Sequence, residues 1–414
     1  MCVTTMERNI LRELAKRVVE VSHRQINADK YALWLKHNRL ERTRPLIRVA
    51  PEGAWCELVS DDSLRCESDF GRKYERDLRQ RIYRSEHLKD DTYISNAIWA
   101  DSVFVNTGWG IEPKKIVTNT ERGAFSYEHP LKNPDDFAKM KMPRIHIDEQ
   151  QSQRNVEALQ DVLGDILKVK LARTVWDLGV DTTLVDTLAS LRGNEQFMMD
   201  MYERPEWIHE VMSFMTNAII ELLNDLEKNV DLEIVDDATC DGLGGYYITD
   251  ELPSKGYDGK RACLRDLWGS SMAQEFVGVS PEMHYEFGLQ YQIRLLEKFG
   301  LNCYGCCEPL DRKIDHVKRI PNLRRVSISP WADVDISASQ LQNKYIFSWK
   351  PAPFSLAEPE FNTEIVRADI TKAVNAARRH NCIFEMTLKD THTVRNEPKR
   401  FEQWLQIARE VIEA

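Results

Sequence analysis

Three thiols and a carboxylate gather in the segment LNCYGCCEPL, residues 301–310. A segment of this kind could bind a metal ion, form a redox pair, or close a strand with small core residues. Catalytic zinc takes about three protein ligands from cysteine, histidine and carboxylate groups and keeps one position open. The candidate zinc ligands are Cys306, Cys307, Glu308 and, from a later segment, His392. A zinc ion held there would act as a Lewis acid or lower the pKa of a thiol.

A second cluster, LEIVDDATCDG at residues 232–242, carries three aspartates beside a glycine-rich turn. A neighbouring carboxylate raises the pKa of a carboxyl group, which can then protonate or position a leaving group. We therefore expect a catalytic role among Asp236, Asp237 and Asp241. The alternative is structural, because aspartates before glycine commonly cap a turn.

Aromatic and charged residues also stand where predicted strands end. Aromatic faces suit a flat or methylated ligand, including a quaternary amine held by a cation–π contact, and a lysine suits a carboxylate. Ordinary core packing and a surface salt bridge are the alternatives. The candidate substrate-binding residues are Trp176, Asp181, Tyr247, Trp268, Trp349 and Lys350.

The elements that must position these residues alternate between strands and helices. Apolar runs rich in β-branched residues predict strands that open the segments 44–51, 171–181, 232–242, 301–309, 323–335, 344–353 and 381–390. Helical spacing of apolar residues predicts helices over 204–228, 280–300 and about 401–412. Pro205 lies near the start of the first, and Ser280 is the N-cap of the second.

Strands that alternate with helices indicate parallel βαβ units in the α/β class. Six or more units favour a closed (β/α)₈ TIM barrel, and the G-x-G-x-x-G motif of an open dinucleotide-binding sheet is missing. Residues 1–42 are predicted to form an N-terminal helical extension, residues 43–414 the barrel, and the charge-rich residues 52–110 an inserted cap. Active sites of such barrels gather at the carboxyl ends of the strands, where the clusters above lie.

Composition narrows the range of partners. The 414 residues carry a net charge of −10, which argues against nonspecific binding to nucleic acid or an anionic membrane. No apolar run reaches the roughly 18–20 residues of a membrane span. The N-terminus reads as an amphipathic helix rather than a targeting peptide. Nine cysteines without an export signal suggest reduced thiols, so we expect a cytoplasmic, small-molecule-facing protein that could form a homodimer.

The segment SPEMHYEFGLQYQIRLLEKFG followed by LNCYGCCEPL resembles the uroporphyrinogen decarboxylase superfamily, in which an SPE helix leads into a strand that ends in a His-x-Cys-Gly motif. Residues EHPLKNPDDFAKMKMP, the stretch from DTTLVDTLASLRGNEQ to the helix at 205, and KYIFSWKPAP resemble further family segments in the same order. The resemblance covers about residues 105–414 and consists of many weak matches.

That resemblance implies a (β/α)₈ barrel and one of two chemistries: decarboxylation of a porphyrinogen without a cofactor, or zinc-assisted methyl transfer involving a corrinoid. The arginine-rich N-terminal motif of the decarboxylase has no counterpart in ERTRPLIRV, which favours the methyltransferase branch. The chain departs from that branch too. Asn302 and Tyr304 stand where the His-x-Cys ligands would lie, and Asp390 and His392 stand near the place of the later cysteine.

The sequence thus predicts a methyltransferase that moves a methyl group between a small methylated substrate, such as a methoxylated aromatic or a methylamine, and a corrinoid on a separate partner protein. The Asp-x-His-x-x-Gly motif of a cobalamin-binding domain is missing from the chain. Two alternatives stay open: a metal-independent decarboxylase or lyase of a tetrapyrrole or aromatic acid, and a non-catalytic corrinoid-binding protein.

Overall fold

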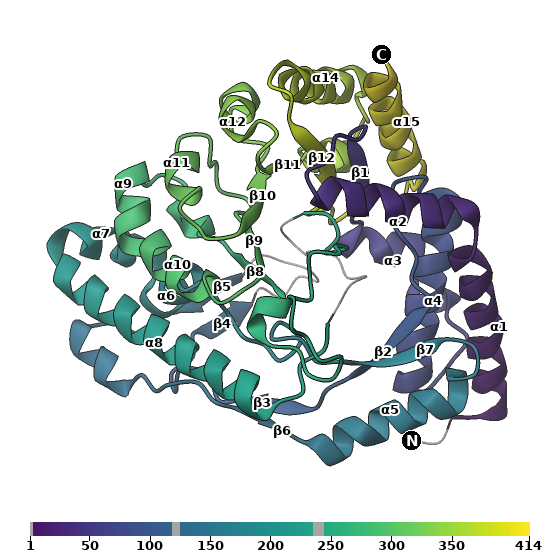
Figure 1. Ribbon diagram of the computed structural model, residues 1–414, viewed down its shortest axis with the longest axis horizontal. Coiled ribbons are helices and arrows are strands. Elements are labelled where there is room, and N and C mark those ends of the chain that lie inside the picture. The colour runs from purple at the N-terminus through teal and green to yellow at the C-terminus, as the bar shows by residue number, and fades with distance from the viewer. Residues whose placement is uncertain (1–2, 118–124, 235–243) are drawn as a thin grey trace.

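The computed structural model describes residues 3–117, 125–234 and 244–414. Its largest sheet has six parallel strands in the order β1-β12-β11-β10-β9-β8 (Figure 1). The strands are β1 (Leu46–Val49), β8 (Trp268–Ser271), β9 (Leu301–Tyr304), β10 (Leu323–Ile328), β11 (Ile346–Trp349) and β12 (Ile383–Leu388). The first and last of them in the chain, β1 and β12, lie side by side, with Arg48 opposite Thr387. The protein therefore has an α/β fold with a parallel sheet.

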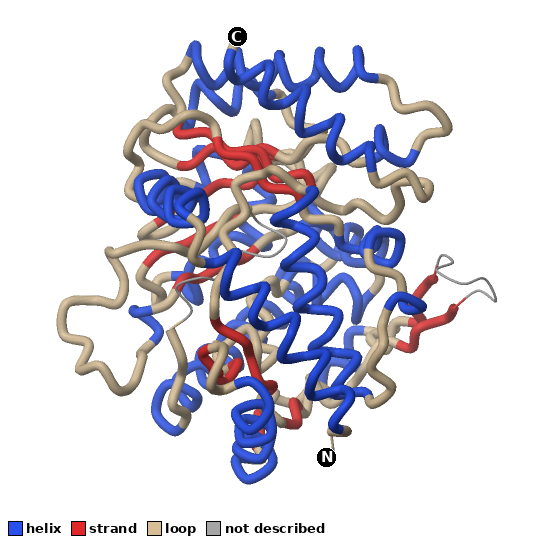
Figure 2. The backbone as a smooth tube through the Cα atoms, turned by 90° about the vertical axis from the view of Figure 1, so that its right-hand side faces the viewer, coloured by secondary structure: helices blue, strands red, loops and turns tan. Residues whose placement is uncertain are grey.

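Three smaller pairs of strands accompany this sheet. The parallel pair joins β2 (Ala97–Asp101) to β7 (Lys168–Ala172). The antiparallel pairs are β3 (Phe104–Asn106) with β6 (Ile145–Ile147), and β4 (Lys114–Val117) with β5 (Phe125–Glu128). Figure 2 shows the pair β4–β5 projecting from the body of the molecule, in line with the exposure of all its residues.

Helices surround the strands. The longer ones are α1 (Thr5–Ser22), α2 (Gln25–Asn38), α4 (Asp69–His87), α5 (Glu149–Leu163), α8 (Pro205–Asn229), α14 (Thr363–Arg379) and α15 (Lys399–Glu413). The shorter ones are α3 (Trp55–Leu58), α6 (Val185–Arg192), α7 (Asn194–Glu203), α9 (Pro281–His284), α10 (Gln290–Leu296), α11 (Ile314–Val317), α12 (Val334–Leu341) and α13 (Phe354–Ala357). A turn of π-helix, Tyr285–Leu289, joins α9 to α10.

Local chemistry explains several helix starts. The Thr4 hydroxyl accepts a hydrogen bond from the Glu7 amide, and the Glu7 carboxylate accepts one from the Thr4 amide, which forms a capping box at α1. The Ser280 hydroxyl accepts from the Met283 amide at 3.2 Å, and Pro281 takes the first position of α9, as the sequence predicts. Pro205 likewise begins α8.

The apolar side of the large sheet packs under helices. Phe384, Met386 and Leu388 of β12 and Phe347 of β11 belong to one buried cluster with residues of α12, α14 and α15. A second cluster packs around α8, and a third joins α1, α4 and α5. Because side chains alternate along a strand, the other side of the sheet presents Glu385, Thr387 and Ser348.

Residues 52–110, predicted to form an inserted cap, contain regular elements. This segment holds the 19-residue helix α4, which packs on α1, and the strand β2, which pairs with β7. Its high charge lies on the outer face of α4, where Arg76 and Arg81 pair with nearby carboxylates, while Leu78 and Ile82 are buried. The segment is therefore part of the α/β framework.

The strands predicted in segments 44–51, 301–309, 323–335, 344–353 and 381–390 are present as β1, β9, β10, β11 and β12. The strand expected from residue 171 begins earlier, as β7. Most of segment 232–242 lies outside the described residues. The structure adds β2, β3, β4, β5, β6 and β8, which were not predicted. Among the described helices, none is long and apolar enough to cross a membrane.

Candidate functional site

The inner side of the large sheet, opposite the helices α12, α14 and α15, is polar and buried. Along β12 it presents Glu385 and Thr387 and, just past the strand, Lys389. Parallel sheets are usually apolar on both sides, so charged side chains here need a specific role. The neighbouring strands add Arg48, Ser348, Lys350, Arg325 and Ser327, which are all buried.

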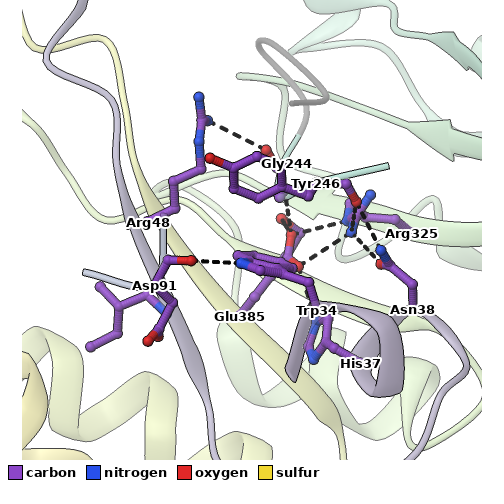
Figure 3. Close-up of polar contacts among 12 residues, drawn as sticks. Trp34, His37, Asn38, Arg48, Asp91, Gly244, Tyr246, Arg325 and Glu385 are labelled. Carbon is purple, nitrogen blue, oxygen red and sulfur yellow. Dashed lines mark hydrogen bonds and ion pairs between the residues drawn. The ribbon is translucent and has the colours of Figure 1, made fainter. Parts of the chain in front are cut away.

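An ion pair between Glu385 and Arg325 is the centre of this inner side (Figure 3). Glu385 Oε1 lies 3.0 Å from Arg325 Nε, and both side chains are fully buried. Oε1 also accepts hydrogen bonds from the Ser348 hydroxyl at 2.5 Å and the Gly245 amide at 2.9 Å. Burial opposes ionisation of the carboxyl group, but Arg325 and His37 outweigh it, so the pKa of Glu385 is well below its usual range.

Helix α2 completes the ion-pair cluster. His37 Nε2 lies 3.0 Å from Glu385 Oε2, and Asn38 Oδ1 accepts from Arg325 Nη2 at 2.7 Å. The Asn38 amide nitrogen donates to the carbonyls of Tyr246 at 2.9 Å and Ile248 at 2.6 Å. The predicted N-terminal extension, residues 1–42, therefore contributes side chains to the interior of the sheet (Figure 3).

Lys350 extends this network toward the carboxyl ends of the strands. Its ammonium group donates to the Ser348 hydroxyl at 2.7 Å and the Ser348 carbonyl at 3.1 Å. Ser348 in turn donates to Glu385, so the three side chains form a chain of hydrogen bonds. Burial disfavours the charged form and lowers the pKa of Lys350 to about 8. A lysine with this pKa can donate a proton near neutral pH.

Cys306 and Cys307 follow β9 after Gly305, whose φ of 93° favours glycine. Their sulfur atoms lie 3.5 Å apart. The hydrogen bond with Cys307 favours the thiolate form of Cys306, and burial opposes it. The charge of Lys389 also favours the thiolate, so the pKa of Cys306 is lowered. Lys389 Nζ lies 3.7 Å from Cys306 Sγ. The backbone turn thus brings the two adjacent thiols together at the carboxyl end of the sheet.

Lys389 and Asp390 complete this thiol group. The Lys389 ammonium donates to the Asp390 carboxylate, and Cys307 Sγ lies 3.7 Å from Asp390 Oδ2. Burial disfavours the ammonium form, but Cys306 and Asp390 outweigh it and raise the pKa of Lys389. The pKa of Cys307 is raised, chiefly by its hydrogen bond with Cys306 and by burial. Of the two thiols, Cys306 is therefore the one that ionises more readily.

The structure does not gather the four predicted zinc ligands into one set. The Glu308 carboxylate is buried and accepts from the amides of Ala273 at 3.0 Å and Cys306 at 2.9 Å, so it supports its own loop. His392 is exposed beside Gly53. Across residues 3–117, 125–234 and 244–414, no three histidine, cysteine or acidic side chains form a group that could hold a metal ion. The residues as placed do not fit a three-ligand zinc site.

The predicted substrate-binding residues separate into two groups. Trp268 is buried on the inner side, with the Arg325 guanidinium 5.5 Å from its ring centre and the Tyr247 ring 5.3 Å away. Together with Lys350, these two aromatic residues lie at the polar side of the sheet. Trp349 lies on the opposite side, buried in the core and stacked on Phe384, so its expected substrate contact is replaced by packing.

Trp176 and Asp181 also have local structural partners. Trp176 stacks on Phe299 at 5.8 Å between ring centres, and its indole nitrogen donates to the Trp268 carbonyl at 3.3 Å. The exposed Asp181 carboxylate accepts from the Thr183 amide at 2.7 Å and from the Thr187 hydroxyl. The three predicted catalytic residues, Asp236, Asp237 and Asp241, lie outside the described residues.

Sequence reasoning missed Glu385, Arg325, His37 and Asn38. Two signals were available: an ionisable residue in the middle of an apolar strand, as in IFEMTL, and the paired arginines in LRRVSIS. Which partners these groups meet depends on strands and a helix far apart in the chain.

Comparisons with known proteins give one informative result. No protein-family model matches the chain, and no curated protein matches it in sequence. Among solved structures, the chain is similar to a methyltransferase from Methanosarcina mazei, with a TM-score of 0.50 and 9% sequence identity. The match covers 92% of this chain and 98% of that one. At this identity the likeness concerns the fold.

Proposed function

We propose that this chain is a cytoplasmic methyltransferase related to the uroporphyrinogen decarboxylase superfamily. It would move a methyl group between a small methylated substrate and a corrinoid carried by a partner protein. The large sheet, with β1 beside β12, and the pair β2–β7 would be parts of a (β/α)₈ barrel. The similarity in fold to a methyltransferase supports this proposal.

The observation that carries the proposal is the polar group at the carboxyl ends of the strands. Lys350, with a pKa of about 8, lies on the same side of the sheet as Cys306, whose pKa is lowered, and its neighbour Lys389. Active sites of parallel α/β folds lie at this edge. Transfer of a methyl group from an ether or an uncharged amine leaves the bonding electron pair on the donor's oxygen or nitrogen, which must then take up a proton.

In the proposed reaction, the Lys350 ammonium group supplies that proton to the leaving oxygen or nitrogen. Ser348 and Glu385 hold the Lys350 side chain in place through their hydrogen bonds. Trp268 and Tyr247 provide aromatic faces for a flat or methylated substrate. A bound corrinoid would supply the nucleophilic metal that accepts the methyl group. Asp236, Asp237 and Asp241 remain proposed as further proton donors or positioning groups.

A decarboxylase is the second candidate. The buried cations Arg48, Arg325 and Lys350 share the inner side of the sheet, where they could attract the carboxylate of a substrate. Zinc remains a proposal without an assigned ligand set, and no step above uses it. Metal analysis of the purified protein separates the candidates, since stoichiometric zinc would contradict the metal-independent decarboxylase.

The direct test mixes the protein with reduced Co(I) cobalamin and a panel of methoxylated aromatics and methylamines. We expect the spectrum of methylcobalamin to appear with at least one donor, and to appear much more slowly with the Lys350→Met variant. The matched control is Lys344→Met, because Lys344 is exposed and lies in the turn before β11, at the other end of the strand from Lys350. If no donor gives methylcobalamin, or both variants behave alike, the proposed role fails.

A further inference from the structure

A second site lies beside β1, and none of the residues that line it belongs to the thiol group. A pocket of about 470 Å³ opens between the turn from α1 to α2, the end of α4, residues 88–94 and α15. Arg44, which lines it, comes two residues before β1 begins, and Asp91 accepts a hydrogen bond from the Ile47 amide at 2.8 Å. Two further lining residues, Arg84 and Asp90, bond to Val49, the last residue of β1. The pocket therefore lies alongside β1.

The charges around this pocket are unbalanced. Six cations line it against three carboxylates, although the whole chain has a net charge of −10. The cations are Arg24, Lys30, Arg44, Arg84, Lys89 and Arg409, and the carboxylates are Asp29, Asp90 and Asp91. A local excess of positive charge on an acidic protein raises the local concentration of anions.

The two buried carboxylates are already used by the fold. Asp91 accepts two hydrogen bonds from Arg44, at 2.7 and 2.9 Å, and one from Arg409 at 2.7 Å. Asp90 accepts from the Val49 amide at 2.8 Å, the Thr92 amide at 3.0 Å and the Thr92 hydroxyl at 2.8 Å. These aspartates hold the loop 88–94 against β1, and their ion pairs do not include Lys30 or Lys89.

Two of those cations are lysines whose ion pairing differs from that of the arginines. Within the described part of the chain, the side chains of Lys30 and Lys89 form no ion pair with a carboxylate. Arg24 pairs with Glu20 at 3.2 Å while both side chains remain largely exposed. An anion could therefore meet several cations here without first displacing a buried ion pair.

The wall of the pocket is apolar. Val21, Ile26, Leu33 and Ile94 line it, and Ile26 keeps 62% of its surface exposed. An isoleucine this exposed at the edge of a cationic pocket would be covered by a ligand with an apolar body. The volume lies within the range of roughly 300–1,000 Å³ found for small-molecule sites.

We propose that this pocket binds a small organic anion, in which an apolar body of about the size of a bicyclic ring carries a carboxylate or phosphate. The apolar part lies on Ile26 and Leu33, and the anionic group meets Lys30 and Lys89 at the rim. None of the residues that line this pocket belongs to the thiol group or to the Glu385 cluster, so a ligand bound here is an effector rather than a substrate. The proposal is independent of the proposed function.

The test is isothermal titration calorimetry of the full chain with 1-naphthyl phosphate, 1-naphthoate and neutral 1-naphthol. We expect at least one anion to bind and naphthol to bind at least about tenfold more weakly. Stronger binding of the phosphate or of the carboxylate identifies which anion the site prefers. Binding should weaken when NaCl is raised from about 50 to about 300 mM.

Two variants locate the binding. The double variant Lys30→Glu and Lys89→Glu should raise the Kd of the anion by about tenfold or more. Its control is the double variant Lys36→Glu and Lys344→Glu, which changes two exposed lysines outside the pocket. This control should keep the Kd within about twofold of the wild-type value. Ile26→Ser, at an exposed position, should weaken the binding of the naphthyl compounds. If neither anion binds, if naphthol binds as tightly as the anions, or if the two double variants behave alike, the proposal is wrong.

Discussion

The carboxylate of Glu385 on β12 and the guanidinium of Arg325 on β10 meet across the intervening strand β11, with 3.0 Å between Oε1 and Nε. His37 of α2 lies 3.0 Å from the other carboxylate oxygen. Three distant parts of the chain therefore share one buried charge cluster. Such a cluster fixes the relative positions of the helix and the strands, because each charge depends on the others for its partner.

Replacing Glu385 with glutamine should destabilise the protein strongly. The variant leaves the Arg325 charge buried without its carboxylate, which typically costs about 3–5 kcal/mol. Urea unfolding measures the loss. The control is Glu410→Gln, since Glu410 forms an exposed pair with Arg367, and it should cost no more than about 1 kcal/mol. A loss of similar size in both variants would contradict the role given to the buried pair.

The lowered pKa of Glu385 also predicts how the free energy of unfolding depends on pH. The pKa of Glu385 is depressed in the folded protein, so its stabilisation is present above the ordinary glutamate pKa of about 4.3 and is lost as pH falls below it. The free energy of unfolding should therefore fall between about pH 5 and pH 3 more steeply in the wild type than in Glu385→Gln. Parallel pH profiles for the two proteins would show that the shift is absent.

Gly245 should not tolerate a side chain. A Cβ atom there would lie 2.2 Å from the ring of Trp34, which is fully buried and donates to the Asp91 carbonyl at 2.7 Å. Gly245→Ala should cost about 1–3 kcal/mol in urea unfolding. Gly278→Ala is the matched control, because a Cβ at Gly278 meets nothing within 4 Å. Equal stabilities of the two variants would mean that the backbone around Gly245 can shift away from Trp34 at little cost.

Cys306 should ionise more readily than an ordinary thiol. Its pKa is lowered by the Cys307 thiol and by Lys389, whereas burial raises the pKa of Cys382 to about 12. The ultraviolet absorbance of thiolate, followed against pH, should show an early step that is missing from Cys306→Ser and retained in Cys382→Ser. Lys389→Met should shift that step to higher pH. A first step unaffected by Cys306→Ser would contradict the assignment.

Much of the framework could be predicted from sequence, because β9, β10, β11 and β12 carry apolar residues typical of buried strands. Strand β8 was missed since its sequence, WGSS, has a glycine and two serines with little preference for strands. The cap was predicted because α4 is rich in charge, although its apolar residues recur at helical spacing.

The site was harder to predict for a different reason. Lys350 and Cys306 could be found because they follow strands. The pairing of Glu385 with Arg325 and His37 depends on the order of the strands and on where α2 packs. Local sequence patterns predict neither. Conversely, His392 and Glu308 have ligand-type side chains close to the right strands, but one is exposed and the other is used by its own loop.

Proton donation by Lys350 makes a prediction about pH. The donor must be protonated, and its pKa is about 8, so the rate of methyl transfer should fall as pH rises above about 8. Lys350→Arg keeps the positive charge but gives up its proton far less readily, so it should lose activity while retaining substrate binding. Unchanged activity in this variant would remove Lys350 from the proposed chemistry.

The most direct measurement is the transfer of an isotope-labelled methyl group in a single turnover. The wild-type protein is mixed with a labelled donor found in the panel and with excess Co(I) cobalamin, and the label is traced by mass spectrometry. We expect labelled methylcobalamin and demethylated donor in equal amounts with the wild type, and the same products formed much more slowly with Lys350→Met. Absence of labelled methylcobalamin, or release of carbon dioxide from a carboxylated donor in its place, would contradict the account.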